Sequence, residues 1–227
     1  MGPGAGVFAR YNLNTRLAWK NGFNFGKVSF ADEASPDPFQ RSRNLSFHSN
    51  ILEITSQLEV NFFRFEPRKE RYKFTPYLSF GVSGFYFNPK AELDGETYAL
   101  QPIGTEGQND ESTGKKPYSR FGFAIPVGGG FKYRFHPAWT LGVELGVRVT
   151  FTDYLDDVST TYYPLNEILR ENGPIAAYMS DPTQRRSGVS NNFDQRGDPT
   201  NKDSYMFLIV NVNYLLKSTV GGLPKFR

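Results

Sequence analysis

Long stretches of the sequence alternate bulky apolar residues with small or polar ones. In residues 139–152 every odd position is apolar, from Trp139 to Phe151, while the even positions carry Thr, Gly, Glu144 or Arg148. Successive side chains of a strand point to opposite faces, so this alternation predicts a strand with one apolar and one polar face. Six further segments alternate in the same way, at 5–13, 16–29, 51–63, 73–87, 119–135 and 204–215.

The connections between these seven predicted strands alternate between short and long. Short connections lie at about 12–15, 66–72 and 136–138, and long ones at about 31–45, 88–118 and 154–203. In an antiparallel meander this places every long loop at the same end, as in outer-membrane barrels with short periplasmic turns and long external loops. The pattern therefore predicts one domain over residues 1–227, an all-β, antiparallel up-and-down transmembrane β-barrel with three external loops. A short helix is expected at 165–178 in the third loop.

The number of strands completes this prediction. Single-chain bacterial barrels have an even number of strands, and this sequence shows seven. The first of them is followed by a short turn, which means that it runs from the long-loop end. We therefore expect an eight-stranded type of barrel, with the eighth strand preceding residue 1.

The polar faces of the strands carry many charges, which is informative about what they face. In a soluble core these charges would be strongly destabilising, because an unpaired buried charge costs several kcal/mol. In a narrow barrel, charges of opposite sign can pair across the lumen. The polar network predicted for the lumen comprises Arg10, Lys20, Glu53, Gln57, Glu59, Lys132, Arg134, Glu144, Arg148, Asn211 and Asn213.

Composition adds several exclusions. The 227 residues contain no Cys, which excludes disulfides and thiolate metal sites, and they contain no apolar run long enough for a transmembrane helix. The net charge of +3 comes from dispersed Lys and Arg, and no nucleic-acid partner is expected. Aromatic residues make up 16% of the chain. Those beside the short turns predict an interfacial girdle, namely Trp19, Phe62, Phe74, Tyr133, Phe135 and Trp139.

Few residues are candidates for chemistry. Asp153, Asp156 and Asp157 begin the third long loop, and their carboxylates form a weak candidate site for Ca²⁺. The alternative is that these residues only form a turn and a solvated rim. A lipid hydrolase or acyltransferase would need a Ser–His pair. Ser46 and His48 share a face and are the one candidate pair, since the other histidine, His136, lies in a tight turn. We expect no cofactor and no catalysis.

Several longer stretches resemble a known family. They include FARYNLN (8–14), TPYLSFGVSGFYFNPKA (75–91), GTEGQ (104–108), KKPYS (115–119) and TDYLDDVSTTY (152–162). These stretches resemble the Bacteroidota family of small outer-membrane β-barrels that includes the type IX secretion component PorG. The resemblance implies an eight-stranded barrel without catalysis and, by analogy with that component, a ring lipoprotein as periplasmic partner.

These patterns favour a non-enzymatic outer-membrane barrel with a structural or docking role, and the resemblance implies that this role is in the type IX secretion or gliding apparatus. The alternatives are a lipid-modifying enzyme, a narrow pore and a soluble lipocalin-like binder. Besides outer-membrane lipids, a protein partner in the periplasm or outer membrane is expected. The turn containing Arg68, Lys69 and Arg71 is the candidate docking surface.

Overall fold

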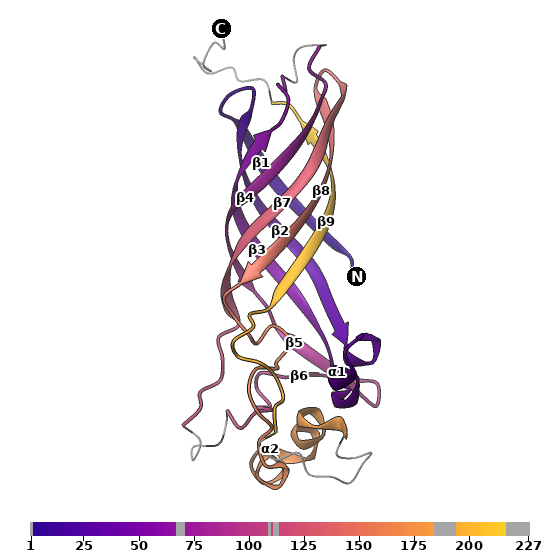
Figure 1. Cartoon of the computed structure of the whole chain (residues 1–227), viewed down its shortest axis with the longest axis vertical. Coiled ribbons are helices and arrows are strands. Elements are labelled where there is room, and N and C mark those ends of the chain that lie inside the picture. Colours follow the sequence, from indigo (N-terminus) through magenta and orange to yellow (C-terminus); the bar gives the residue numbers. More distant parts are fainter. Residues whose placement is uncertain (1, 67–70, 109, 111–113, 184–193, 217–227) are drawn as a thin grey trace.

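In the described part of the chain, one antiparallel sheet has nine strands, and seven of them curl into the wall of a barrel (Figure 1). The computed structural model describes residues 2–66, 71–108, 110, 114–183 and 194–216. Strands follow one another around the wall in the order β1-β2-β3-β4-β7-β8-β9. Their bounds are Gly4–Asn12 (β1), Leu17–Ala31 (β2), Ser46–Asn61 (β3), Phe74–Tyr86 (β4), Phe121–His136 (β7), Trp139–Thr150 (β8) and Ser204–Tyr214 (β9).

Each strand of this wall pairs antiparallel with its neighbours. The predicted antiparallel barrel meander is therefore confirmed. β1 and β9 are the first and last strands of this described wall. The Arg10 guanidinium of β1 donates a hydrogen bond to the Asn213 side-chain oxygen of β9, at 3.1 Å, which brings the two margins of the wall together.

The hairpin of β2 and β3 is longer than the alternation predicted. Its ladder continues through Lys27–Asn50 to Ala31–Ser46, so β3 begins at Ser46 and not at residue 51. The polar residues there interrupt the apolar pattern, but backbone pairing does not require apolar side chains. The loop that remains contains a 3-10 turn at Asp32–Ala34 (η1) and helix α1 at Pro38–Arg43, capped by the Asp37 side chain.

The other two long loops also contain regular structure. Residues 88–118 include a hairpin that was not predicted, formed by β5 (Pro89–Leu93) and β6 (Glu96–Ala99), with β5 pairing to β3. The third loop contains α2 at Leu165–Ser180, which kinks at Gly173, where φ is 85°. All these elements gather at one end of the barrel, opposite the short turns (Figure 1). We call the described parts of 32–45, 88–120 and 151–203 the loop region.

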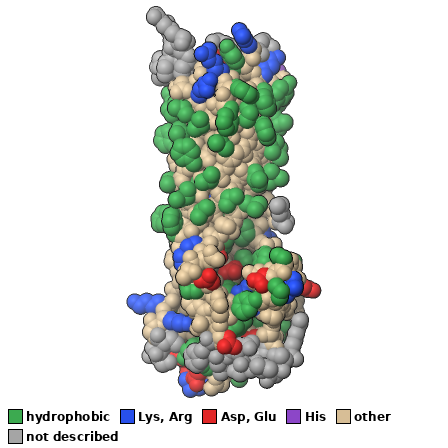
Figure 2. Space-filling model, in the orientation of Figure 1, with side chains coloured by type: hydrophobic (Ala, Val, Ile, Leu, Met, Phe, Trp, Pro, Cys, Tyr) green, Lys and Arg blue, Asp and Glu red, His purple; other side chains and the backbone are tan. Residues whose placement is uncertain are grey.

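The barrel wall is apolar outside and polar inside. Phe121, Phe123 and Val82 are 65–74% exposed on the outer surface. Figure 2 shows that hydrophobic side chains cover the middle of the cylinder, with Lys and Arg at the short-turn end and charges of both signs over the loop region. Among the described residues, neither helix has the length and apolarity needed to cross a membrane. The wall is thus an inside-out arrangement, typical of strands that face lipid.

Candidate functional site

The inner face of the barrel gathers a buried network of charged side chains. Strand alternation places them there: most of them, such as Glu53, Lys132 and Arg148, lie between outward-facing apolar neighbours on their strands. Lys20, Glu53, Gln57, Glu59, Lys132, Arg134, Glu144 and Arg148 are all buried. Asn211 and Asn213 are half-buried on β9, where the Asn213 amide donates to Asn211 at 2.8 Å.

Glu59 is the centre of one cluster. Its carboxylate lies 2.7 Å from the Arg10 guanidinium, 2.5 Å from the Lys132 ammonium and 3.6 Å from the Lys20 ammonium. These three cations come from β1, β7 and β2, so one carboxylate links strands from across the barrel. Lys132 also donates to the Asn61 side chain at 3.0 Å.

The other two inner carboxylates have partners of their own. Glu144 lies 2.5 Å from the Lys20 ammonium and accepts a hydrogen bond from the Tyr77 hydroxyl at 2.6 Å. Glu53 forms an ion pair with Arg148 at 3.1 Å and accepts from the Tyr205 hydroxyl at 2.9 Å. Each of the three carboxylates therefore has at least two donors. Glu59 contacts three cations, whereas Glu144 and Glu53 each contact one cation and one tyrosine hydroxyl. Such pairing is the condition for burying charge without a large penalty.

Two glycines make room for this packing. A Cβ built on Gly146 would collide with the Arg148 guanidinium, and one on Gly26 would lie 2.5 Å from the Phe207 ring. The rings of Tyr77, Phe85 and Tyr205 are buried in the lumen as well. Bulky and charged side chains therefore occupy much of the interior of the described barrel.

The sequence did not single out the tyrosines of this network. Neither Tyr77 nor Tyr205 belongs to the polar network that the sequence predicts. Alternation alone predicts which face a residue occupies. It does not predict which residues of distant strands meet, because that depends on register and on closure of the wall.

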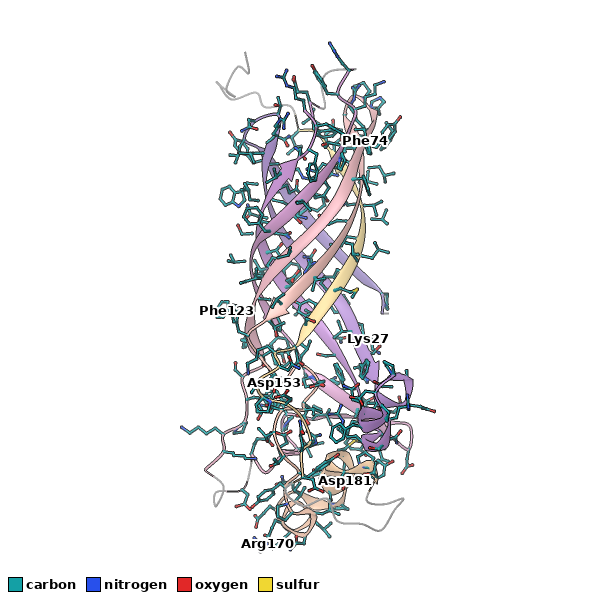
Figure 3. All side chains as sticks on the ribbon, in the orientation of Figure 1. Lys27, Phe74, Phe123, Asp153, Arg170 and Asp181 are labelled. Atoms are coloured by element: carbon teal, nitrogen blue, oxygen red, sulfur yellow. The ribbon has the colours of Figure 1, made fainter. Side chains whose placement is uncertain are left out.

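The predicted acidic cluster does not converge on a single point. Asp157 accepts hydrogen bonds from the Tyr118 hydroxyl, at 2.7 Å, and from the Thr105 hydroxyl. Asp156 instead accepts from the backbone N–H of Val158 at 3.0 Å, and Asp153 is buried where the barrel wall joins the loop region (Figure 3). Among the described residues, no three Asp, Glu, His or Cys side chains are arranged to hold a metal ion.

A buried ion pair in the loop region was missed by the sequence reasoning. Arg196 lies 3.0 Å from Glu106, and both side chains are almost fully buried. Glu106 also accepts from the backbone N–H groups of Ser159 and Thr160. Burial acts to raise the pKa of Glu106, but Arg196 and these donors outweigh it, so this pKa lies below its usual value. The pair ties the second long loop to the third.

The remaining candidates lie apart from both networks. Ser46 and His48 share a face of β3, and no hydrogen bond joins them within the described structure. His136 accepts a backbone hydrogen bond from Ala138 in its turn, at 3.3 Å. Arg68 and Lys69 lie outside the described residues, whereas Arg71 is exposed, 5.9 Å from the Tyr72 ring centre.

The expected girdle residues are exposed on the outer wall beside the short turns. Phe74 lies near that end of the barrel in Figure 3, and Trp139 contacts Tyr214 with ring centres 4.9 Å apart. The Trp19 indole N–H donates to the Ser56 hydroxyl at 2.8 Å, which satisfies its polar atom on the outer wall. The full set exposed there is Trp19, Phe62, Phe74, Tyr133, Phe135 and Trp139.

Comparison with known proteins identifies a family and a likeness to a solved structure. Residues 2–170 match the model of a family described as "Domain of unknown function (DUF6089)". A crystal structure of Acinetobacter baumannii CarO2 is similar with a TM-score of 0.30 and 12% sequence identity, covering 78% of this chain and 87% of that one. Comparison with curated proteins gives no match.

Proposed function

The chain belongs to the DUF6089 family of domains of unknown function, and from that premise we propose that it is a non-enzymatic β-barrel of the bacterial outer membrane with a structural or docking role. The observation that carries this proposal is the inside-out wall. Apolar side chains cover its outer surface, while Glu53, Glu59 and Glu144 are buried inside with their cationic partners. Only a lipid surround makes the outer face favourable.

Docking is favoured over transport because of the filled interior. The same salt bridges that satisfy the inner carboxylates also occupy the space that a solute would need. Docking is favoured over catalysis because Ser46 and His48 form no hydrogen-bonded pair in the described structure. The surfaces left for a protein partner are therefore the short turns and the loop region.

More specifically, we propose that the protein is a component of the type IX secretion or gliding apparatus, with a ring lipoprotein as its periplasmic partner. Its support is the resemblance of the sequence stretches quoted above. The periplasmic turns are then the surface that meets the partner. Exposed Arg71, with Arg68 and Lys69 beside it in sequence, gives this turn three cationic residues, next to Glu66 and Glu70.

The test is a crosslinking pull-down from native membranes with Arg68, Lys69 and Arg71 replaced together by Ser. Folding should be unaffected, because exposed charges in a turn contribute about 1 kcal/mol or less. Recovery of the periplasmic partner should fall strongly. The matched control replaces Lys116, Arg170 and Lys202 by Ser, which removes the same charge from exposed positions of the loop region. If both variants recover every partner of the wild type, the turn is not the docking surface.

A further inference from the structure

Two exposed arginines lie on adjacent segments at the short-turn end of the barrel. Arg16 belongs to the turn between β1 and β2, and Arg64 follows the end of β3. The backbone N–H of Asn61 donates to the Arg16 carbonyl at 2.7 Å, and that of Phe65 donates to the Thr15 carbonyl at 2.9 Å. These hydrogen bonds hold the segments that carry the two arginines against each other.

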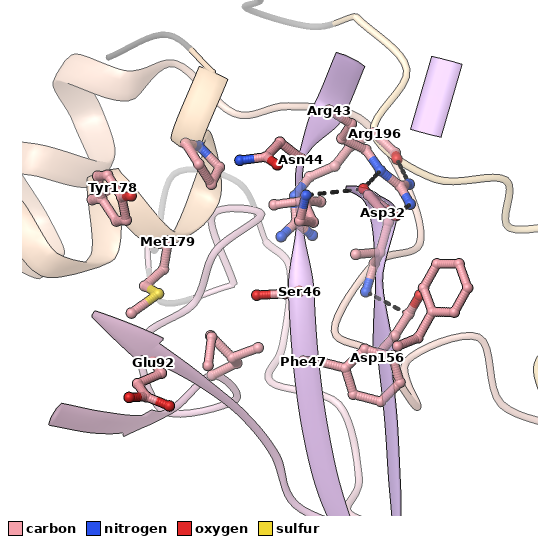
Figure 4. A pocket seen from close by; sticks show the side chains of 16 residues that line it. Asp32, Arg43, Asn44, Ser46, Phe47, Glu92, Asp156, Tyr178, Met179 and Arg196 are labelled. Atoms are coloured by element: carbon pink, nitrogen blue, oxygen red, sulfur yellow. Dashed lines mark hydrogen bonds and ion pairs between the residues drawn. The ribbon is translucent and has the colours of Figure 1, made fainter. Parts of the chain in front are cut away.

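The two arginines differ from the others because they have no partner within the described structure. In the loop region, Arg43 binds Asp32 beside a cavity of about 110 Å³ (Figure 4), and Arg196 pairs with Glu106. Every other described arginine also has a neighbour with which its side chain interacts. Arg16 and Arg64 have none among the described residues. Their guanidinium groups are therefore available to an external ligand.

The position of Arg16 along the barrel indicates where such a ligand lies. Trp19 follows three residues later on β2 and is exposed on the wall, in the aromatic girdle. Three residues of a strand tilted by about 40° span about 8 Å along the membrane normal. The headgroup layer on each side of the hydrocarbon core is about 5–8 Å thick. In a membrane, the Arg16 guanidinium is thus within reach of the lipid headgroups.

The surroundings of the two arginines suit the acyl chains of a lipid. Leu13 lies in the turn that contains Arg16, and Phe62 and Phe63 directly precede Arg64. All three apolar side chains are exposed. They extend the apolar surface of the wall up to the guanidinium groups, so charge and apolar surface meet as they do in a lipid molecule.

The charge of this end favours a lipid with a net negative headgroup. In sequence, the three short connections and their flanks, 12–16, 62–73 and 136–138, contain six Lys and Arg residues and two Glu. Cations close to a membrane surface attract anionic lipids, with a contribution from each Lys or Arg. A zwitterionic headgroup would bring its own ammonium group to the guanidinium groups, whereas an anionic headgroup brings the phosphate alone.

We propose that Arg16 and Arg64 together bind the phosphate of an anionic phospholipid, whose acyl chains lie against Leu13, Trp19 and Phe62. Guanidinium groups bind phosphate oxygens through paired, charge-assisted hydrogen bonds. This inference rests on the membrane location proposed above and is independent of any protein partner.

The test uses the fluorescence of Trp19 in the full chain reconstituted into lipid vesicles. The chain contains two tryptophans, so Trp139→Phe leaves Trp19 as the single reporter. Lipids with brominated acyl chains quench a tryptophan that they contact. Titrating brominated phosphatidylglycerol against phosphatidylcholine therefore gives the relative binding constant of the two lipids beside Trp19. Phosphatidylglycerol should be preferred by about fivefold or more, the effect expected of one exposed cation.

Replacing Arg16 and Arg64 together by Ser in this background should lower the preference by about fivefold or more. The barrel should fold as before, because both side chains are exposed. If the double variant fails to fold, Arg64→Ser alone decides. The matched control is Lys116→Ser with Lys202→Ser, which removes the same charge from exposed positions of the loop region. It should leave the preference unchanged.

Three outcomes would overturn the proposal. The first is equal binding of the two lipids before Arg16 and Arg64 are replaced, and the second is an equal loss of preference in the control. The third is a double variant that keeps the lipid preference but no longer recovers a periplasmic protein in the pull-down, which would assign the arginines to protein docking. Quenching of Trp19 by neither lipid would contradict the membrane location itself, so the two failures are distinguishable.

Discussion

At the scale of single residues, the inner face depends on how each buried charge is compensated. Glu59 is fully buried and faces Arg10, Lys20 and Lys132. The three cations rely on this one carboxylate and on Glu144, which contacts Lys20. Removing a shared carboxylate therefore leaves more than one buried cation uncompensated.

We predict that Glu59→Gln destabilises the barrel by about 3–5 kcal/mol, the usual cost of breaking a buried ion pair from one side. The free energy of unfolding in a urea titration from lipid vesicles measures it. Glu171→Gln removes a carboxylate from an exposed pair on α2 and should change stability by less than about 1 kcal/mol. Equal effects of the two substitutions would show that the inner ion pairs contribute no more to stability than an exposed surface pair does.

At the scale of one element, β8 shows how alternation divides a strand between two environments. Its residues alternate strictly between exposed and buried from Trp139 to Thr150. Val143 is exposed on the outer wall and Thr140 is buried inside. A charged substitution is therefore expected to cost most at the positions of β8 that face outward.

We predict that Val143→Arg destabilises folding into bilayers by about 2–4 kcal/mol, because it places a charge in the apolar band near the middle of β8. Thr140→Val should have a smaller effect, since it removes one inner hydroxyl and adds no charge. Folding titrations in vesicles give both values. A harmless Val143→Arg together with a severe Thr140→Val would mean that the outer wall does not face lipid.

At the scale of the whole molecule, the loop region contains several buried carboxyl groups whose pKa values are shifted. In the loop region, burial raises the pKa of Asp157 to about 6 and, together with the nearby Asp203, raises that of Asp156 to about 8. Burial raises the pKa of Asp203 to about 6 as well. Arg43 and Arg196 oppose the shift of Asp156 but do not cancel it.

The sign of the effect follows from proton binding. An unfolded Asp has a pKa near 3.9, so between about pH 4 and pH 8 the folded loop region binds more protons than the unfolded one. The stability that these groups contribute to the loop region is therefore greatest below about pH 4 to 5. It is lost as pH rises through about 6, the pKa of Asp157 and Asp203, and then through about 8, the pKa of Asp156. Glu106 acts in the opposite direction, but only below its usual pKa of about 4.5.

We predict that amide hydrogen exchange in the described loop region is faster at pH 9 than at pH 5.5, after correction for the intrinsic rate. Exchange in the barrel strands should change much less. Asp156→Asn should remove the part of the change that occurs near pH 8. A loop region that exchanges equally at both pH values would contradict the assigned protonation.

The sequence by itself determined the wall of this protein. Period-two alternation in segments such as 139–152 is a local property, and it predicts both the strand and the face of each side chain. The alternation of loop lengths then determined the meander. For the same reason Glu53, Glu59 and Glu144 were predicted to lie inside, because a residue's face depends only on its position along its own strand.

Only the tertiary structure decided what these residues contact. The link from Glu59 to Arg10 and Lys132 depends on the register of strands far apart in sequence. The loop region depends still more on long-range contacts: Arg196 meets Glu106, 90 residues away, and no local pattern marks either residue. Strand faces follow from short-range periodicity, whereas ion pairs and the loop cavity require the whole chain to be folded, which is why the sequence could not predict them.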